Sequence, residues 1–143
     1  MNTNLGFCLA LHRAHASLQF KLDNELGLYH GISFNDFALL NLLAQADGGR
    51  VSIPDLVRPM GQPQSTVLRQ LILLEKIGLV VREGANGDRQ AVLRPAGRAL
   101  VNTARETADD ICTEALASVA PAAVAMVSAS LLTLARTPNL EPS

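Results

Sequence analysis

A short stretch near the middle of the chain carries polar side chains suited to contacts with nucleic-acid bases and phosphates. A helix predicted over residues 63–77 would present four of them on one outer face: Gln64, Ser65, Thr66 and Arg69. A glutamine can pair with an adenine edge, a serine or threonine hydroxyl can bond to bases or phosphates, and an arginine can read guanine or bind phosphate. This face is therefore a candidate for contacting double-stranded DNA.

The residues before this helix have the pattern of a helix-turn-helix. Ser52 opens a short helix, Gly61 allows a sharp turn after it, and Leu56 and Val67 are placed to lock the two helices together. Gln62 lies in the turn and joins the candidate DNA contacts. A helical hairpin with a solvated polar face is the alternative interpretation, so the segment that follows decides between them.

That segment is predicted to be a β-hairpin. Two strand-like runs, residues 79–82 and 90–93, are separated by a segment that contains Asn86-Gly87, a dipeptide typical of tight hairpin turns. Arg82 and Arg89 would lie in this hairpin and complete the set of candidate DNA contacts. Two helices followed at once by a hairpin indicate a winged helix-turn-helix.

Two helices are predicted ahead of this unit. The first covers residues 5–28 and is broken by Gly27 and by the His30-Gly31 pair. The second is capped by Ser33, with Asp36 placed to reach back to the cap, and stops at residues 47–49.

Two further helices are predicted after the hairpin, one from Pro95 to about Ser118 and one that starts at Pro121. The fold class is therefore mainly α, a winged helix-turn-helix of about six helices with a small hairpin. With 143 residues, the chain fits a single domain, residues 1–143.

The net charge of −1 argues against a nucleic-acid binder until the chain is divided. Residues 50–98 hold eight basic and four acidic side chains, whereas the rest of the chain holds four basic and nine acidic ones. The positive charge is thus concentrated on the segment that would meet phosphates.

The chain resembles the multiple-antibiotic-resistance regulator (MarR) family over about residues 5–136. The most specific matches are residues 64–67, 74–82, 88–89 and 93–98. The resemblance implies a homodimeric transcription regulator, a repressor or an activator, that needs no cofactor. It also implies release from DNA by a small, often phenolic or aromatic, ligand.

The same resemblance assigns roles to the segments. Helices 5–28 and 99–136 would form the dimer, and residues 33–98 would form the DNA-binding lobe. The helix over 63–77 would enter the major groove, and the hairpin would reach the minor groove. We expect a repressor that a small-molecule effector releases from a pseudo-palindromic operator.

This sequence departs from the family pattern at several positions. Gln90 stands where the family has a second wing arginine, Arg94 stands where it has a threonine, and the hairpin looks a few residues short. Ile72 and Leu73 lie where the family usually has polar residues, so they add core packing or leave an exposed apolar strip. The strip would suit an alternative function, a winged-helix module that binds protein and not DNA.

Two cysteines suggest a second alternative, a redox-sensing repressor of the same fold. Cys8 lies near the start of the first helix, where backbone N–H groups favour a thiolate, and His12 is one turn later. Its position is similar to that of the reactive cysteine in hydroperoxide-responsive members of the family, although the supporting tyrosines are not matched. Cys112 would be a resolving partner. The opposing interpretation is that both are small buried hydrophobic residues.

No catalytic or metal site is predicted, because the sequence shows no nucleophile–base pair, carboxylate pair or set of three metal ligands. An effector pocket is placed by helix position alone, with a lining of His12, His15, Phe20 and Phe37. The charge-free run 115–135 is too rich in alanine and hydroxyl residues to favour a membrane span. With no signal-peptide pattern either, a cytoplasmic protein is expected.

Overall fold

The computed structural model describes residues 2–85 and 88–137. Its helices are α1 (Thr3–His30), α2 (Phe34–Gln45), α3 (Val57–Met60), α4 (Gln64–Lys76), α5 (Pro95–Ala115) and α6 (Pro121–Ala135). Its strands are β1 (Arg50–Ser52), β2 (Val80–Glu83) and β3 (Gln90–Leu93), and two 3-10 turns are η1 (Asp47–Gly49) and η2 (Ile53–Leu56). The prediction of a mainly α winged helix-turn-helix is confirmed.

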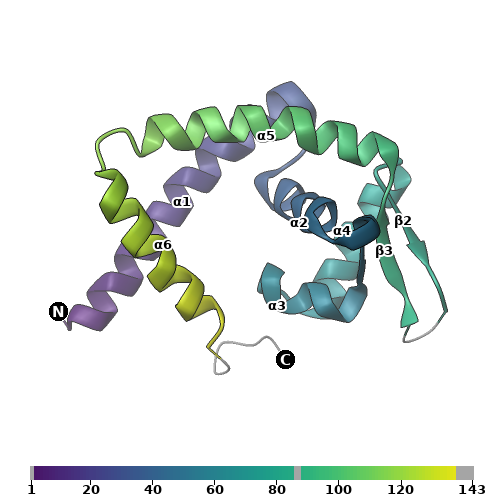
Figure 1. Ribbon diagram of the computed structural model, residues 1–143, viewed down its shortest axis with the longest axis horizontal. Coiled ribbons are helices and arrows are strands. Elements are labelled where there is room, and N and C mark those ends of the chain that lie inside the picture. The colour runs from purple at the N-terminus through teal and green to yellow at the C-terminus, as the bar shows by residue number, and fades with distance from the viewer. Residues whose placement is uncertain (1, 86–87, 138–143) are drawn as a thin grey trace.

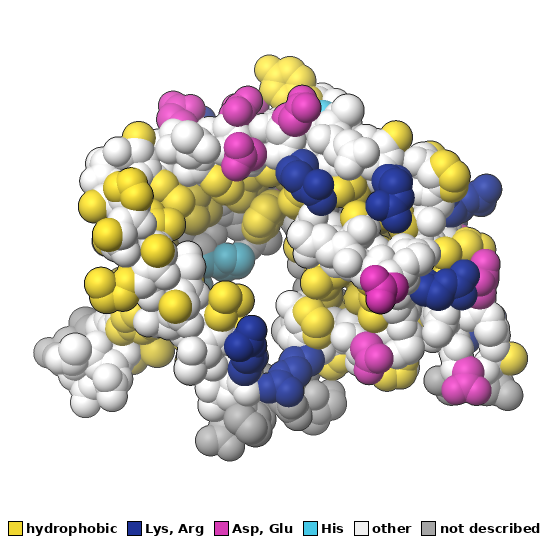
Figure 2. All heavy atoms as spheres, in the orientation of Figure 1, with side chains coloured by type: hydrophobic (Ala, Val, Ile, Leu, Met, Phe, Trp, Pro, Cys, Tyr) yellow, Lys and Arg dark blue, Asp and Glu magenta, His cyan; other side chains and the backbone are white. Residues whose placement is uncertain are grey.

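The helices divide the molecule into an arm and a lobe (Figure 1). The arm consists of α1 and α6, the lobe contains α2, α3, α4 and the sheet, and α5 spans the distance between them. The two ends of α5 therefore belong to different parts of the molecule, one beside the sheet and one beside α6. This arrangement leaves a hollow between α6 and the lobe (Figure 2).

The first helix is longer than predicted, and the break at Gly27 is wrong. Gly27 lies inside α1, which continues to His30 and ends at Gly31, where φ is 71°. The N–H of Gly31 bonds to the carbonyls of Gly27 and Leu26. A left-handed glycine therefore ends the helix, and a glycine on its exposed side does not.

The second helix begins as predicted. The Ser33 hydroxyl accepts from the backbone N–H of Asp36, and the Asp36 carboxylate accepts from the N–H of Ser33. A further carboxylate comes from α1, because Asp23 accepts from the N–H of Phe34 at 2.7 Å. The first turn of α2 is thereby fixed to α1 as well as to its own cap.

The helix-turn-helix has the predicted turn. The single short helix of the prediction is a 3-10 turn, η2, followed by α3, and Gly61 follows with a φ of 61°. Leu56 and Val67 are both fully buried, as expected for residues that join the two helices. α4 starts after Pro63 and stops just before Gly78, whose φ is 83°.

The wing is a three-stranded antiparallel sheet, in the order β1-β3-β2, rather than a hairpin alone. The hairpin strands were predicted, and the third strand, β1, was not. β1 pairs with β3 so that Arg50 lies opposite Val92 and Ser52 lies opposite Gln90. The predicted turn residues Asn86-Gly87 lie outside the described residues.

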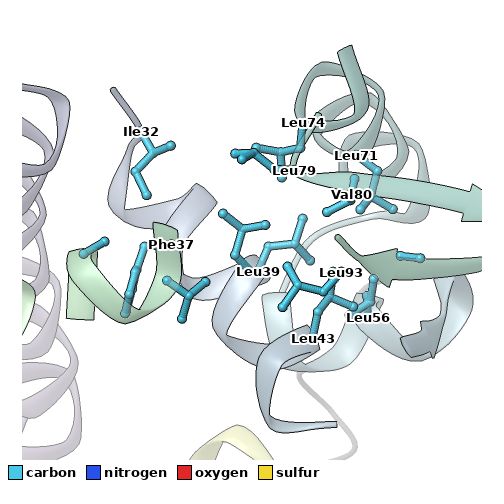
Figure 3. Close-up of a cluster of buried hydrophobic side chains, with 14 of the residues drawn as sticks. Ile32, Phe37, Leu39, Leu43, Leu56, Leu71, Leu74, Leu79, Val80 and Leu93 are labelled. Carbon is cyan, nitrogen blue, oxygen red and sulfur yellow. The ribbon is translucent and has the colours of Figure 1, made fainter. Parts of the chain in front are cut away.

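One apolar core joins α2, α4 and the sheet (Figure 3). Leu39 and Leu43 from α2 meet Leu71 and Leu74 from α4, and Val80 and Leu93 close the cluster from the strands. The same core continues along α5 through Val101 and Ala104. The lobe is therefore held by continuous burial, which fixes α4 relative to the wing.

The arm is different, because its apolar side chains are exposed. α6 has no buried residue, and α1 is buried only at Leu22 and Leu26, in its second half. Within the described residues, no helix is long and apolar enough to cross a membrane. α5 also ends at Ala115, earlier than the predicted Ser118, and Pro121 starts α6 as predicted.

Candidate nucleic-acid interface

The first two turns of α4 present the predicted polar residues to solvent. Gln64, Ser65 and Arg69 are exposed and Thr66 is half-buried. The Arg69 guanidinium donates to the Thr66 hydroxyl at 3.3 Å. We call Gln64, Ser65, Thr66 and Arg69 the recognition surface.

The start of α4 is also suited to an anion. Pro63 precedes the helix and provides no side-chain cap, and the first turn carries no acidic residue. Backbone N–H groups at this end are consequently left for an external acceptor, and the helix dipole favours a negative charge there. A phosphate group would meet both conditions.

Arg82 lies beside α4 rather than open to solvent. Its backbone N–H donates to one Glu75 carboxylate oxygen at 3.2 Å, and its Nε donates to the other at 3.0 Å. These bonds to Arg82 lower the pKa of Glu75 below its ordinary value, with a smaller contribution from Arg89. The pair connects β2 to α4, so it holds the wing against the recognition helix.

The wing carries a second set of contacts that the sequence did not predict. Arg50 of β1 donates to Gln90 of β3 at 3.0 Å and to Glu83 of β2 at 3.3 Å. These side chains cross all three strands. Gln90 lies at the position of the family's second wing arginine, and here its side chain accepts a hydrogen bond that holds the Arg50 guanidinium in place.

Arg89 is an exposed cation of the wing, as Arg50 is. Its side chain faces solvent, while its backbone carbonyl accepts from the N–H of Ile53 at 3.1 Å. This bond fixes the backbone of Arg89 to the start of η2. The residue is held beside the helix-turn-helix.

A cavity of about 480 Å³ lies between the arm and the helix-turn-helix. α1 and α2 line one side of it, and the turn between α3 and α4 lines the other. Its lining residues are His15, Gln19, Phe34, Asn35, Ala38, Pro59, Met60, Gly61 and Gln62. We call it the turn cavity, because it reaches the turn that precedes the recognition helix.

Gln62 therefore lies at a different place from the rest of the predicted DNA contacts. It is half-buried in the lining of the turn cavity, and its Oε1 is buried with no hydrogen-bond partner among the described residues. Its position next to α4 in the chain predicts a DNA contact, but its side chain lines the turn cavity instead.

Residues 30–91, from the end of α1 to the return strand of the wing, match the model of the MarR family. This segment, which is less than half of the chain, is similar to the MarR family.

Solved structures, one of them described as a MarR family transcriptional regulator, share the fold over nearly the whole chain. Sco3205 from Streptomyces coelicolor, solved in complex with DNA, has a TM-score of 0.84 and 21% identity. The match covers 100% of this chain and 91% of the Sco3205 chain. CouR from Rhodococcus jostii RHA1, bound to p-coumaroyl-CoA, has a TM-score of 0.82 and 20% identity, with coverage of 94% and 93%.

A third solved structure, NadR in complex with 4-hydroxyphenylacetate, has a TM-score of 0.75 and 22% identity, and the match covers 90% of this chain and 91% of NadR. No curated protein sequence matches the chain. At these identities the structural likeness establishes the fold, and the residues themselves must carry any functional argument.

The four residues predicted for an effector pocket do not share one cavity. His15 lines the turn cavity, whereas His12 is exposed on α1 and Phe20 is 70% exposed. Phe37 is buried in the core, 6.2 Å from the ring of Phe34. Helix periodicity cannot identify the polar lining residues Gln19 and Asn35, because it does not show which turns of two helices meet.

Ile72 and Leu73, the two residues of α4 that depart from the family pattern, differ in exposure. Ile72 is half-buried, so it adds packing, whereas Leu73 is 62% exposed. Ile77, one turn later, is exposed too. The second half of α4 and the residue that follows it therefore carry a short apolar strip, Leu73 and Ile77.

The cysteines also differ in environment. Cys8 is exposed in the first turns of α1, and Cys112 is half-buried on α5. Burial, followed by the charge of Asp109, raises the pKa of the Cys112 thiol. Among the described residues, no group of three or more His, Cys, Asp or Glu side chains is placed to hold a metal ion.

Proposed function

We propose that this protein is a homodimeric, DNA-binding repressor of the MarR family. It would bind a pseudo-palindromic operator and be released by a small phenolic or aromatic effector. The observation that carries the proposal is the recognition surface, four polar side chains on the uncapped start of α4 beside a wing with an exposed arginine. Sco3205, with the same fold, was solved in complex with DNA.

The recognition surface would enter the major groove. Gln64 and Arg69 have the side chains for base edges, and Ser65, Thr66 and the backbone of the first turn suit phosphates. Arg89 would reach the minor groove. Arg82 is a positioning residue in this proposal, because Glu75 occupies its guanidinium.

The charge distribution supports this orientation. Figure 2 shows acidic side chains over the half of α5 that lies next to α6, and hydrophobic ones over α6. Residues 50–98, with eight basic and four acidic side chains, belong to the lobe. Phosphates would be attracted to the lobe and repelled from α5.

The arm would form the dimer. Its exposed large apolar side chains include Leu5, Phe7, Leu9, Met126, Val127 and Leu132. An exposed apolar surface on these two helices marks an interaction site in a protein that is otherwise well packed. In this proposal the dimerisation helices are residues 5–28 and 99–136, and residues 33–98 would form the DNA-binding lobe of a single domain, 1–143.

The turn cavity is the proposed effector site. A molecule there would touch α1 of the arm and Pro59–Gln62 of the lobe at once. It would shift the turn that sets the direction of α4, and a change in that direction moves the recognition surface relative to DNA. The protein would act in the cytoplasm.

Selection of bound fragments from the source genome tests this proposal. The purified protein should retain a small set of fragments, bind the best one far more tightly than random duplex, and lose affinity steeply as salt is raised. Equal affinity for the selected fragment and random duplex would overturn the proposal. A winged-helix module that binds only protein predicts no salt-dependent DNA binding at all.

Exposure of Cys8 favours one second candidate, a redox-sensing repressor. In that case hydroperoxide should release the selected fragment from the protein, and a Cys8→Ser variant should retain it. A Cys112→Ser variant separates the resolving role from the sensing one. Identical release of wild type and Cys8→Ser would eliminate this candidate.

A further inference from the structure

We propose that Gln70 is a positioning residue, which fixes the direction of the recognition helix α4 relative to α2 and to the arm. It acts through Asp36, the capping carboxylate of α2. This rests on the proposed function, because it names a determinant of DNA selectivity that acts through the same helix. The proposal depends on where Gln70 faces, on what Asp36 binds, and on a bond from α1 to the same turn of α2.

Gln70 faces α2 and not solvent. It lies in the middle of α4, directly after the exposed Arg69, but its side chain is half-buried and its Oε1 is buried. Its Nε2 donates to Asp36 Oδ1 at 3.0 Å. Gln70 is therefore no part of the recognition surface, and its loss would remove no contact to DNA.

The orientation of the Gln70 carboxamide follows from the chemistry of Asp36. A carboxylate only accepts hydrogen bonds, so the Nε2 donor of Gln70 must face it. Oε1 of Gln70 is then turned away, and it has no hydrogen-bond partner among the described residues. An unpaired buried acceptor is unfavourable, and an apolar side chain of similar size would avoid that cost. We therefore attribute the glutamine to the direction that it gives α4, and not to stability.

Asp36 is itself held in place before it meets Gln70. Its Oδ2 accepts from the backbone N–H of Ser33 at 3.2 Å, and its own N–H donates to the Ser33 hydroxyl at 3.0 Å. This capping box fixes the carboxylate to the start of α2. Oδ1 is left to accept from α4, so Gln70 binds an acceptor whose position is already determined.

The same turn of α2 is bonded to the arm. Asp23 of α1 accepts from the backbone N–H of Phe34 at 2.7 Å, two residues before Asp36. A chain of hydrogen bonds therefore runs from α1, through the first turn of α2, to the middle of α4. The apolar core that contains Leu39 and Leu71 (Figure 3) holds these helices together, but apolar burial is not directional. The hydrogen bonds add a preferred angle to that packing.

Two substitutions remove the bond in different ways. Gln70→Glu turns a second carboxylate towards Asp36, and Gln70→Met fills the space without a donor. Fluorescence anisotropy gives the ratio of affinities for the fragment selected from the genome and for random duplex. This ratio should fall about tenfold in Gln70→Glu and less in Gln70→Met, as for residues of one hydrogen-bond network. The salt slope should stay as in wild type, because no phosphate contact is lost. An unchanged ratio in both variants would overturn the proposal.

A reciprocal exchange tests the bond itself. In the double variant Asp36→Asn with Gln70→Glu, the amide nitrogen at position 36 can donate to the carboxylate at position 70. The amide oxygen can still accept from the N–H of Ser33, and the net charge is unchanged. Most of the selectivity that Gln70→Glu loses should therefore return. Gln45→Glu, the same substitution at an exposed glutamine of α2, is the control and should keep wild-type selectivity. A double variant no more selective than Gln70→Glu contradicts the proposal.

Hydrogen exchange on the full chain without DNA tests the positioning independently of DNA binding. The backbone N–H groups of α4 should exchange about tenfold faster in Gln70→Glu than in wild type, and the double variant should reverse this change. Exchange in α6, which belongs to the arm, should stay the same and so exclude general destabilisation. Equal exchange of α4 in wild type and Gln70→Glu would overturn the proposal.

The two measurements separate this proposal from the proposed function. Faster exchange of α4 in Gln70→Glu and its reversal, in a protein that binds all duplexes equally, would support the role of Gln70 and overturn the repressor. Sequence-specific DNA binding that neither Gln70 variant changes would do the reverse.

Discussion

Arg69 and Arg89 lie on different parts of the proposed DNA-binding surface, so their loss should have different effects. Arg69→Ala removes a base contact and should cost about 1–3 kcal/mol on the selected operator, with relaxed specificity at one base pair. Arg89→Ala removes a contact to the phosphates that flank the minor groove and should weaken all sequences alike, reducing the salt slope by about one. Fluorescence anisotropy over a salt series measures both.

Arg105→Ala is the matched control for these two variants. Arg105 is an exposed arginine on α5 that bonds to Asn41, away from the recognition surface. Its loss should leave the salt slope and the base preference as they are. If all three variants lose affinity equally, the recognition surface has no special role in binding.

Glu75 should make the stability of the lobe depend on acid pH. Its bonds to Arg82 lower its pKa in the folded state from the ordinary value of 4.5. A carboxyl group whose pKa is lowered by folding stabilises the folded state at pH values above its pKa in the unfolded chain. This contribution is lost as the pH falls through its pKa in the folded state. Glu75→Gln should therefore lower the free energy of unfolding by about 1 kcal/mol near neutral pH.

Urea unfolding at several pH values measures this contribution. The difference in the free energy of unfolding between wild type and Glu75→Gln should be widest near pH 7. It should shrink as the pH falls from 4.5, the ordinary pKa of the carboxyl, through its lowered value in the folded state. Glu106→Gln, an exposed glutamate on α5, serves as the control and should show a smaller gap. A Glu75→Gln gap that is independent of pH would contradict the role of the charge.

At the scale of elements, two glycines in helices should respond oppositely to alanine. A Cβ on Gly97 of α5 would lie 2.3 Å from the carbonyl oxygen of Leu79 and 2.6 Å from the Leu93 side chain, so Gly97→Ala should destabilise by about 1–3 kcal/mol. Gly27 of α1 has nothing within 4 Å, so Gly27→Ala should stabilise by up to about 1 kcal/mol. Thermal unfolding compares them, and equal signs would contradict the packing of α5 on β2.

The elements also show how far sequence reasoning extends. Helix starts with a chemical signature, such as the Ser33–Asp36 box and Pro121, were predicted correctly, because the capping bonds are local. β1 was missed because three residues carry no periodicity, and only the pairing with β3 makes them a strand. Its residue Arg50, and hence the contact with Gln90, was missed with it.

The candidate site likewise has parts that one helix determines and parts that depend on how several elements pack. The recognition surface follows from spacing along one helix, and the structure keeps Gln64, Ser65 and Arg69 exposed as that spacing predicts. The turn cavity needs the relative position of three elements, so only His15 of its lining was among the effector residues predicted. The pairing of Arg82 with Glu75 likewise depends on how β2 packs against α4.

At the scale of the whole molecule, the exposed arm should set the oligomeric state. Leu132→Glu places a carboxylate on the apolar face of α6 and should weaken the dimer at least about tenfold, because like charges would meet across a two-fold interface. Sedimentation velocity measures the shift towards monomer. Leu73→Glu, the same change at an exposed leucine of the lobe, should leave the dimer intact.

The small charge excess of each lobe means that two lobes must act together on DNA. Residues 50–98 have only four more basic than acidic side chains, so one lobe should hold a half-site weakly. A two-fold dimer places its half-sites about one turn, ~10 bp, apart. Inserting about 5 bp between them turns one half-site to the opposite face of the duplex, and affinity should fall to that of a single half-site.

The same insertion outside the half-sites should have no effect, which controls for DNA length. Applied to Leu132→Glu, the central insertion should change little, because a monomer already reads one half-site at a time. If wild-type protein binds the operator with the central insertion as tightly as the original operator, the two lobes of the dimer are not held in fixed relative positions. It would mean that α5 lets each lobe move independently of the arm, although α5 packs on both α1 and α2.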